Sequence, residues 1–293
     1  MQHEKSHSEK QAISARKILA VFFKYLLSYE RSPRGLIEFI AFNSFGVSMR
    51  FIHDSNLGFP MGQATWQDFF TQGQCGVFGT NNIEPISQSL ENDSNIFAYI
   101  PVVCFYKVRK IQEIHGLVSA TTGKSGSPTT SSVLIIKRGA NIKELSDLKG
   151  KTYGRINQYC TSSYFAPTIY LSDHGFRFQD FFGQVKNIPV SPGNWQNQID
   201  QVISGAIDAT MVDENTWLTN PKNVEETEII GRIDGLPCPI IAYKSIINTQ
   251  FLESFKEMLI ASSRDASAMF SGFIPYAGDG IDVFFKRISK AFD

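Results

Sequence analysis

Short apolar segments alternate with helix-like segments along residues 132–243, and this alternation constrains the fold more than any other feature. Strands are predicted at 132–137 (SVLIIK), 152–156 and 206–212 (AIDATMV), with helices at 162–174 and 194–204. Strands separated by helices usually form a mostly parallel sheet with helices on its faces. In such sheets ligands bind beyond the carboxyl ends of strands, where loops lead into helix N-termini.

The length of the chain predicts two domains. Its 293 residues exceed what one ordinary hydrophobic core supports. Residues 116–131 are rich in Gly, Ser, Thr and Pro, which predicts a loop or a crossing between lobes, and 96–105 is predicted to be a strand. We expect an N-terminal helical extension at 1–35, a first lobe at 36–130 that is completed by 240–293, and a second lobe at 131–239.

The charge balance excludes several classes of partner. Lys plus Arg and Asp plus Glu both number 28, so the net charge is zero. No general basic field attracts nucleic acid or anionic lipid, and an anion site must therefore be local. The four cysteines are widely spaced, without CxxC or a zinc pattern, so we expect no metal site and no cofactor. We also expect a monomer.

The N-terminal segment contains an apolar stretch at 18–27 (ILAVFFKYLL). It is shorter than the ~18–20 residues that a membrane helix needs. Lys24 interrupts it, and SYERSPRG follows where a signal peptide would have a small-residue cleavage site. We therefore interpret it as an amphipathic helix, which leaves a cytosolic protein, a mature form or export by another route open.

The segment at 157–164 (NQYCTSSY) carries the clearest functional pattern. A predicted strand ends, a polar loop follows, and hydroxyl side chains stand at the start of a predicted helix. The first N–H groups of a helix lack intrahelical partners, and the helix dipole places partial positive charge there. Phosphate, phosphonate or carboxylate can bind at such a place without a lysine. The alternative is simple N-capping of the helix by Thr161 or Ser162.

Two longer runs resemble a known family. They are SSVLIIKRGANIKELSDLKGKTYGRINQYCTSSYF and VISGAIDATMVDENTW, and they are similar to phosphonate-binding proteins of ABC importers. The resemblance covers roughly residues 115–293. It implies an α/β, two-lobed type 2 periplasmic-binding-protein fold, in which each lobe is a mixed sheet flanked by helices and two strands form the hinge. It also implies a periplasmic location, an importer permease as partner and a small phosphonate-like or phosphate-like ligand.

The resemblance implies roles for particular residues in the second lobe. Thr161 and Ser162 would donate hydrogen bonds to the anion, with Tyr159 beside them in the same loop. Cys160 stands where the family usually has Ser, and a thiol is a weaker donor than a hydroxyl. Asp213 would accept from an ammonium group on the ligand, or else belong to a turn or a helix cap.

Residues of the lobe crossing and of the first lobe complete the predicted site. Thr130 and Ser131 would add hydroxyls, or else form a plain linker. Thr80 and Asn81 would face the ligand from the first lobe, or else form a turn. Trp195 is expected to pack in the core rather than stack on a ligand.

Two other classes of function remain open. Cys160 beside a helix N-terminus has the setting of an activated thiolate, but no His or Asp partner is identifiable by spacing, so no catalytic residue is predicted. A sensor or effector would use the same fold without a transporter. We expect a binding protein that closes around its ligand by a hinge motion.

Overall fold

The computed structural model describes the strands at 30–31, 37–38, 41–42, 48–54 and 75–80, and residues 88–90, 92, 96–109, 113–122, 126–189, 195–244, 249–261 and 270–292. The helix expected at 18–27 lies outside these residues. In the described part of the chain, no helix is both long enough and apolar enough to cross a bilayer.

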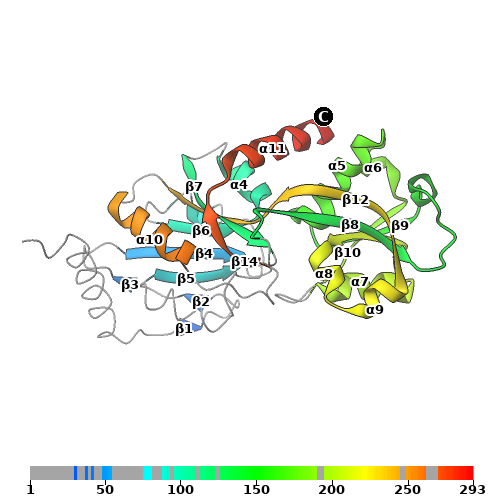
Figure 1. The fold of residues 1–293 in the computed structure, drawn as a ribbon, viewed down its shortest axis with the longest axis horizontal. Coiled ribbons are helices and arrows are strands. Elements are labelled where there is room, and N and C mark those ends of the chain that lie inside the picture. Colours follow the sequence, from blue (N-terminus) through cyan, green and yellow to red (C-terminus); the bar gives the residue numbers. More distant parts are fainter. Residues whose placement is uncertain are drawn as a thin grey trace, which may run out of the picture.

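A seven-stranded sheet forms one half of the molecule (Figure 1). Its order is β14-β7-β13-β6-β4-β3, and β5 also pairs with β4. The pairs of β4 with β5 and with β6 are parallel, and the others are antiparallel. These strands are β3 (Ala41–Phe42), β4 (Ser48–Asp54), β5 (Cys75–Thr80), β6 (Ile96–Ile100), β7 (Ile114–Thr122), β13 (Ile240–Lys244) and β14 (Phe270–Pro275). A separate ribbon pairs β1 (Glu30–Arg31) with β2 (Ile37–Glu38).

A five-stranded sheet of order β10-β9-β11-β8-β12 forms the other half. The pairs β10–β9 and β9–β11 are parallel, whereas β8 is antiparallel to both β11 and β12. The sequence predicted a mostly parallel sheet here, and this sheet is mixed. Its strands are β8 (Thr129–Lys137), β9 (Thr152–Arg155), β10 (Gln184–Asn187), β11 (Ala209–Asp213) and β12 (Thr227–Pro237).

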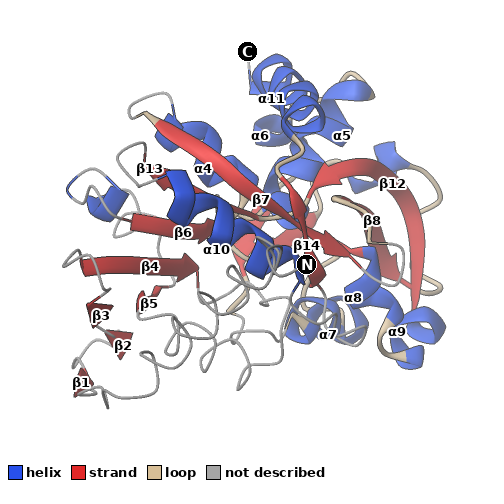
Figure 2. Cartoon of the chain, turned by 60° about the vertical axis from the view of Figure 1, so that its left-hand side comes forward, coloured by secondary structure: helices blue, strands red, loops and turns tan. Residues whose placement is uncertain are grey.

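Helices cover both sheets and bury their apolar faces. Around the five-stranded sheet lie α5 (Ala166–Asp173), α6 (Phe178–Phe181), α7 (Gln196–Ser204), α8 (Glu214–Leu218) and α9 (Pro221–Glu226). The side chains of β8 alternate, because Val133 packs in a cluster with Ile199 of α7, whereas Leu134 packs in a cluster with Ile169 of α5. Near the seven-stranded sheet lie α4 (Val102–Arg109) and α10 (Thr249–Ala261) (Figure 2).

The chain passes between the two sheets twice. The first crossing joins β7 to β8, and the second joins β12 to β13. The crossings are hydrogen-bonded to each other, because the Cys238 N–H donates to the Pro128 carbonyl at 2.9 Å. The Ala120 N–H also donates to the Pro239 carbonyl at 2.8 Å. The two halves are therefore joined by a short paired connection.

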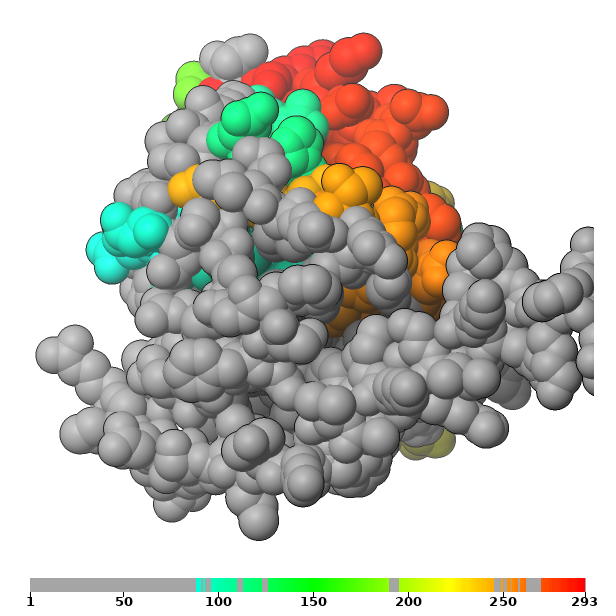
Figure 3. All heavy atoms as spheres, turned by 90° about the vertical axis from the view of Figure 1, so that its left-hand side faces the viewer, coloured from blue at the N-terminus to red at the C-terminus, as the bar shows by residue number. Residues whose placement is uncertain are grey.

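Helix α11 (Gly278–Phe292) makes a third link between the halves. Tyr106 of α4 hydrogen-bonds Ser289 at 3.0 Å, and Arg287 forms an ion pair with Asp173 of α5 at 3.0 Å. Buried Phe285 belongs to the same apolar cluster as residues of both halves. Seen end-on, α11 occupies the upper right of the molecule, beside β14 and α10 (Figure 3).

One prediction made from local composition is wrong and another is right only in part, because the crossing expected within residues 116–131 is the connection from β7 to β8. Residues 96–105 are not one strand, because β6 ends at Ile100 and α4 begins at Val102, with the Pro101 carbonyl accepting from the Cys104 N–H at 2.9 Å. Most of residues 116–131 is strand rather than loop. The small residues of β7 meet close neighbours there, since a Cβ on Gly116 would lie 2.3 Å from the Tyr276 ring.

Residues 147–151 (DLKGK, the DLKGK motif) belong to the first run that resembles the family, and they hold β9 and β10 side by side. Leu145–Leu148 forms a 3-10 turn, and Gly150 follows with a φ of +77°, which only glycine adopts readily. The Gly150 N–H donates to the Phe181 carbonyl at 2.8 Å, and the Gly183 N–H donates to the Lys151 carbonyl at 2.9 Å. A Cβ on Gly183 would lie 2.3 Å from the Gly150 carbonyl oxygen, so the two backbones approach as closely as glycine allows.

Alanine substitutions at Gly183 and Gly280 compare a crowded position with an open one. We expect Gly183→Ala to lower the free energy of unfolding by about 1–3 kcal/mol, because backbone atoms must move to admit the methyl group. Gly280→Ala is the control, since nothing lies within 4 Å of that Cβ in α11, and alanine favours the helix. Urea denaturation of both variants measures the effects. A neutral Gly183→Ala would contradict the close approach.

Candidate ligand-binding site

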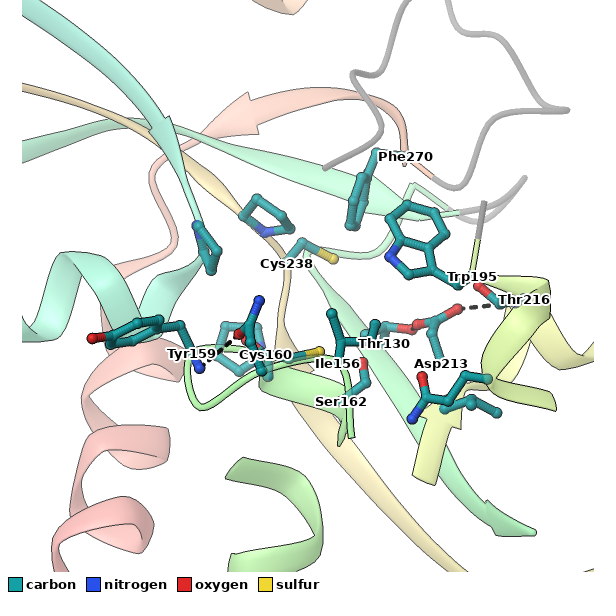
Figure 4. A pocket seen from close by; sticks show the side chains of 17 residues that line it. Thr130, Ile156, Tyr159, Cys160, Ser162, Trp195, Asp213, Thr216, Cys238 and Phe270 are labelled. Atoms are coloured by element: carbon teal, nitrogen blue, oxygen red, sulfur yellow. Dashed lines mark hydrogen bonds between the residues drawn. The ribbon is translucent and has the colours of Figure 1, made fainter. Parts of the chain in front are cut away.

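One pocket lies where the two sheets and the two crossings meet (Figure 4). Its cavity volume is about 90 Å³, room for several water molecules. The polar lining residues are Thr130, Asn157, Thr161, Ser162, Gln198, Asp213 and Thr216. The remaining lining residues are Pro101, Ile156, Tyr159, Cys160, Trp195, Val212, Pro237, Cys238, Pro239 and Phe270.

The loop after β9 is fixed by a buried tyrosine. The Tyr153 hydroxyl donates to the Ser163 carbonyl at 3.0 Å and accepts from the Met211 N–H at 3.0 Å. Ser163 is itself buried, and its Oγ accepts from the Ile156 N–H at 3.0 Å. Burial raises the pKa of Tyr153, so this phenol stays neutral and keeps its proton for the hydrogen bond. Tyr153 of β9 therefore joins the Ser163 end of the loop to both β9 and β11.

The helix begins with a wide turn at the pocket. Thr161–Phe165 is a π-helical turn that continues directly into α5. Such turns are rare and often occur at functional sites. Cys160 caps the turn, with its Sγ accepting from the Ser163 N–H at 3.4 Å. The Thr161 and Ser162 side chains are left at the pocket, next to the positive end of the helix dipole.

Asp213 is buried beside this helix start and caps another helix. Its Oδ1 accepts from the Asn215 N–H at 2.9 Å and from the Thr216 N–H at 3.2 Å, at the start of α8. The Thr130 hydroxyl donates to Oδ2 of the same carboxylate. Burial raises the pKa of Asp213, although these hydrogen bonds oppose the shift. The carboxylate therefore caps a helix, one of the alternatives that the sequence left open, and its role toward a ligand stays a prediction.

The pocket presents neutral hydrogen-bond donors, rather than cationic side chains, to an anion. Among its described lining residues there is no Lys, Arg or His, and Asp213 is the single carboxylate. The described residues also contain no group of three side chains suited to hold a metal ion. Backbone N–H groups and hydroxyls at the start of the wide turn are thus the features that can stabilise a negative charge.

The structure brings six of the nine predicted site residues to this pocket. They are Thr130, Tyr159, Cys160, Thr161, Ser162 and Asp213. The Tyr159 ring is directed away from the pocket centre, and Lys107 of α4 lies 4.6 Å from its centroid. The roles of these residues in binding stay predictions.

Of the other three predicted residues, the structure describes the side chain of Ser131 alone. Ser131 is next to Thr130 in β8 but points elsewhere, because neighbouring strand residues face opposite sides. Its Oγ donates to Asp234 and accepts from Arg232 on the exposed surface. Thr80 ends β5, and the structure does not describe its side chain. Asn81 lies outside the described residues.

Sequence reasoning missed part of the lining. Trp195 was expected in the core, but it precedes α7 and lines the pocket together with Phe270 and Cys238. Local pattern gives no signal for Phe270 or Cys238, because they reach the pocket from β14 and from the second crossing. The tryptophan that does pack in the core is Trp217, whose Nε1 donates to the Thr227 hydroxyl at 2.9 Å.

The two thiols at the pocket differ in exposure. Cys238 is 1% exposed, and burial together with the nearby Asp213 carboxylate raises the pKa of its thiol. Cys160 is half-buried at the start of the wide turn. The described part of the pocket provides no histidine to activate either one as a nucleophile.

Solved structures share this fold. A binding-protein component of an ABC phosphonate transporter from Pseudomonas aeruginosa is 16% identical, with a TM-score of 0.59, covering 82% of this chain and 87% of that one. PhnD1 from Prochlorococcus marinus, solved with methylphosphonate, is 14% identical, with a TM-score of 0.61, covering 83% and 98%. XAC2383 from Xanthomonas citri, solved with ATP, is 14% identical, with a TM-score of 0.62, covering 83% and 96%. The fold is that of the type 2 periplasmic binding proteins, which confirms the predicted fold class.

The sequence gives the family as well. A family model described as the periplasmic substrate-binding protein of phosphonate ABC transporters matches residues 77–277. The match spans well over half of the chain, and the chain belongs to this family. Its members are periplasmic binding proteins of transport systems, not enzymes, and they work with the permease of an ABC transporter. A search among curated proteins gives no significant match.

The first prediction from the site concerns the Tyr153 hydroxyl. We expect Tyr153→Phe to lower the free energy of unfolding by about 1–3 kcal/mol, because a buried carbonyl and a buried N–H each lose their partner. Tyr170→Phe is the matched control, since its ring is half-buried and its hydroxyl makes no hydrogen bond to the residues that the structure describes. Equal stability of the two variants in urea denaturation would contradict the anchoring role of Tyr153.

A second prediction uses thiol labelling. Under mildly alkaline conditions, we expect iodoacetamide to modify Cys160 and to spare Cys238, because only the thiolate reacts and burial raises the pKa of Cys238. Peptide mapping by mass spectrometry measures both rates, with urea-unfolded protein as the control in which both react. Equal labelling in the folded protein would show that the second crossing is open to solvent.

Proposed function

We propose that this chain captures a small phosphonate-like or phosphate-like anion in the pocket between its two halves and delivers it to an ABC importer in the periplasm. The observation that carries the proposal is the anchored helix start at Thr161 and Ser162, which opens into a pocket lined from both halves. The methylphosphonate bound by PhnD1 supports the class of ligand.

The binding energy would come from directed neutral donors. An anion at the wide turn receives hydrogen bonds from hydroxyls and backbone N–H groups whose positions the Tyr153 anchor fixes before binding. Donors that are already oriented bind an anion without a further ordering cost. The Asp213 carboxylate lies on the same polar side of the pocket as this helix start, and it disfavours a ligand with a second negative charge nearby. A monoanion, or a ligand that carries a proton or an ammonium group toward Asp213, therefore fits best.

Hinge closure would complete the site. The paired crossings near Pro128 and Cys238 form the flexible connection, with the lobes divided near residues 130 and 240. Lys107 on α4 and Tyr159 on the binding loop belong to different halves, and their cation–π contact joins these halves. An exposed pair of this kind is worth about 0.5–1 kcal/mol. Closing removes water from the pocket, which strengthens each hydrogen bond to the anion.

Removing the two hydroxyls tests the proposal. We expect Thr161→Ala and Ser162→Ala each to weaken binding of methylphosphonate by about 1–3 kcal/mol, the usual loss for a hydrogen bond to a charged group. Isothermal titration calorimetry measures the affinity, after a thermal-shift screen of phosphate, phosphite, sulfate and methylphosphonate.

Two serine variants serve as controls. Ser172→Ala removes a hydroxyl at the far end of the same helical segment, and Ser131→Ala removes the one beside Thr130 that points away from the pocket. Both are expected to bind like the unmodified protein. Unchanged affinity in Thr161→Ala and Ser162→Ala would refute the assignment of the anion to this helix start.

A further inference from the structure

The pocket has an apolar wall opposite its polar side. The wall is formed by Trp195, Phe270 and the segment Pro237, Cys238 and Pro239. Figure 4 shows the Trp195 and Phe270 rings next to each other, with Thr130, Ser162 and Asp213 on the opposite side of the pocket. Phe270 is 4% exposed, so the wall continues into the core of the first half.

The position of Trp195 is set by the start of α7. Its carbonyl accepts from the Gln198 N–H at 3.2 Å. Gln196, the next residue, exchanges two side-chain hydrogen bonds with Asn223, of 2.6 and 3.1 Å. Asn223 is buried and also donates to the Trp217 carbonyl at 3.1 Å. The indole of Trp195 is thus carried on a fixed helix start, although its ring remains partly exposed at the pocket.

The two sides of the pocket make different demands on a ligand. The polar side holds a small anionic group without any cation among its described residues, which limits the affinity available from charge. The apolar wall presents two aromatic rings and two prolines, which gain nothing from a small hydrated anion. Flat rings favour stacked or edge-to-face contact with another flat ring, beyond the gain from buried apolar area.

We propose that the ligand is an organophosphonate or a phosphate monoester with a flat, apolar substituent. This inference rests on the proposed function, because it places the anion at Thr161 and Ser162. The substituent then lies against Trp195 and Phe270. A bare oxyanion or a methyl-substituted one fills the polar side alone and leaves the exposed part of Trp195 in contact with water.

Three phosphonates with the same head group test the proposal by calorimetry. We expect phenylphosphonate to bind on the order of tenfold more tightly than methylphosphonate, because the ring buries apolar area and stacks on the wall. Cyclohexylphosphonate has similar bulk without a flat ring, and we expect it to bind between the two. Equal affinity of the phenyl and cyclohexyl compounds would overturn the preference for a flat substituent.

Variants of Trp195 show whether this side chain carries the preference. We expect Trp195→Ala to abolish most of the gain for phenylphosphonate while leaving methylphosphonate within about twofold, and Trp195→Phe to retain part of the gain. Equal losses for both ligands in Trp195→Ala would show a merely structural role and overturn the inference.

The outcome for the unmodified protein separates the two proposals. Tight binding of methylphosphonate without any preference for phenylphosphonate would overturn the inference and support the proposed function. Binding of neither compound would overturn the inference, and it would overturn the proposed function as well if phosphate, phosphite and sulfate also failed to bind.

Discussion

The hydrogen bonds of the Tyr153 hydroxyl hold the site together. This buried group joins Ser163 of the wide turn to Met211 of β11, and so fixes the loop after β9 against the middle of the five-stranded sheet. Ser163 then uses its own Oγ to accept from Ile156. Because Ser163 is committed to the fold, only its two predecessors, Thr161 and Ser162, are left at the pocket. A run of three hydroxyls is thereby divided into one structural residue and two that are free to serve a ligand.

Other lining residues of the pocket also combine a structural role with a place at its surface. Asp213 caps α8 and accepts from Thr130, so the strand β8 and the helix α8 meet at one buried carboxylate. Opposite it, Trp195 and Phe270 supply apolar surface from elements far apart in the chain. The pocket therefore has a polar side and an apolar wall. If an anion binds on the polar side and its substituent lies against the wall, the selectivity follows from how both are filled together.

The connection between the two halves permits one kind of motion more readily than others. The crossings are short and paired with each other, and α11 packs against both halves through Tyr106 and Asp173. A large apolar cluster continues through this helix. We infer that a rotation about the paired crossings disturbs less of this packing than sliding the halves past each other would. The proposed closing motion is therefore a hinge rotation rather than a shear.

The sequence by itself determined the local features of this protein. The polar loop and hydroxyls after β9, the glycine turn of the DLKGK motif and the resemblance to phosphonate-binding proteins could all be read from neighbouring residues, because helix starts and tight turns depend on short-range chemistry. The tertiary structure alone decided which side chains meet. It separated Thr130 from Ser131, made strands of most of the segment 116–131, and brought Trp195, Phe270 and Cys238 together from three distant segments. Such contacts depend on strand pairing between distant segments, which local composition does not determine.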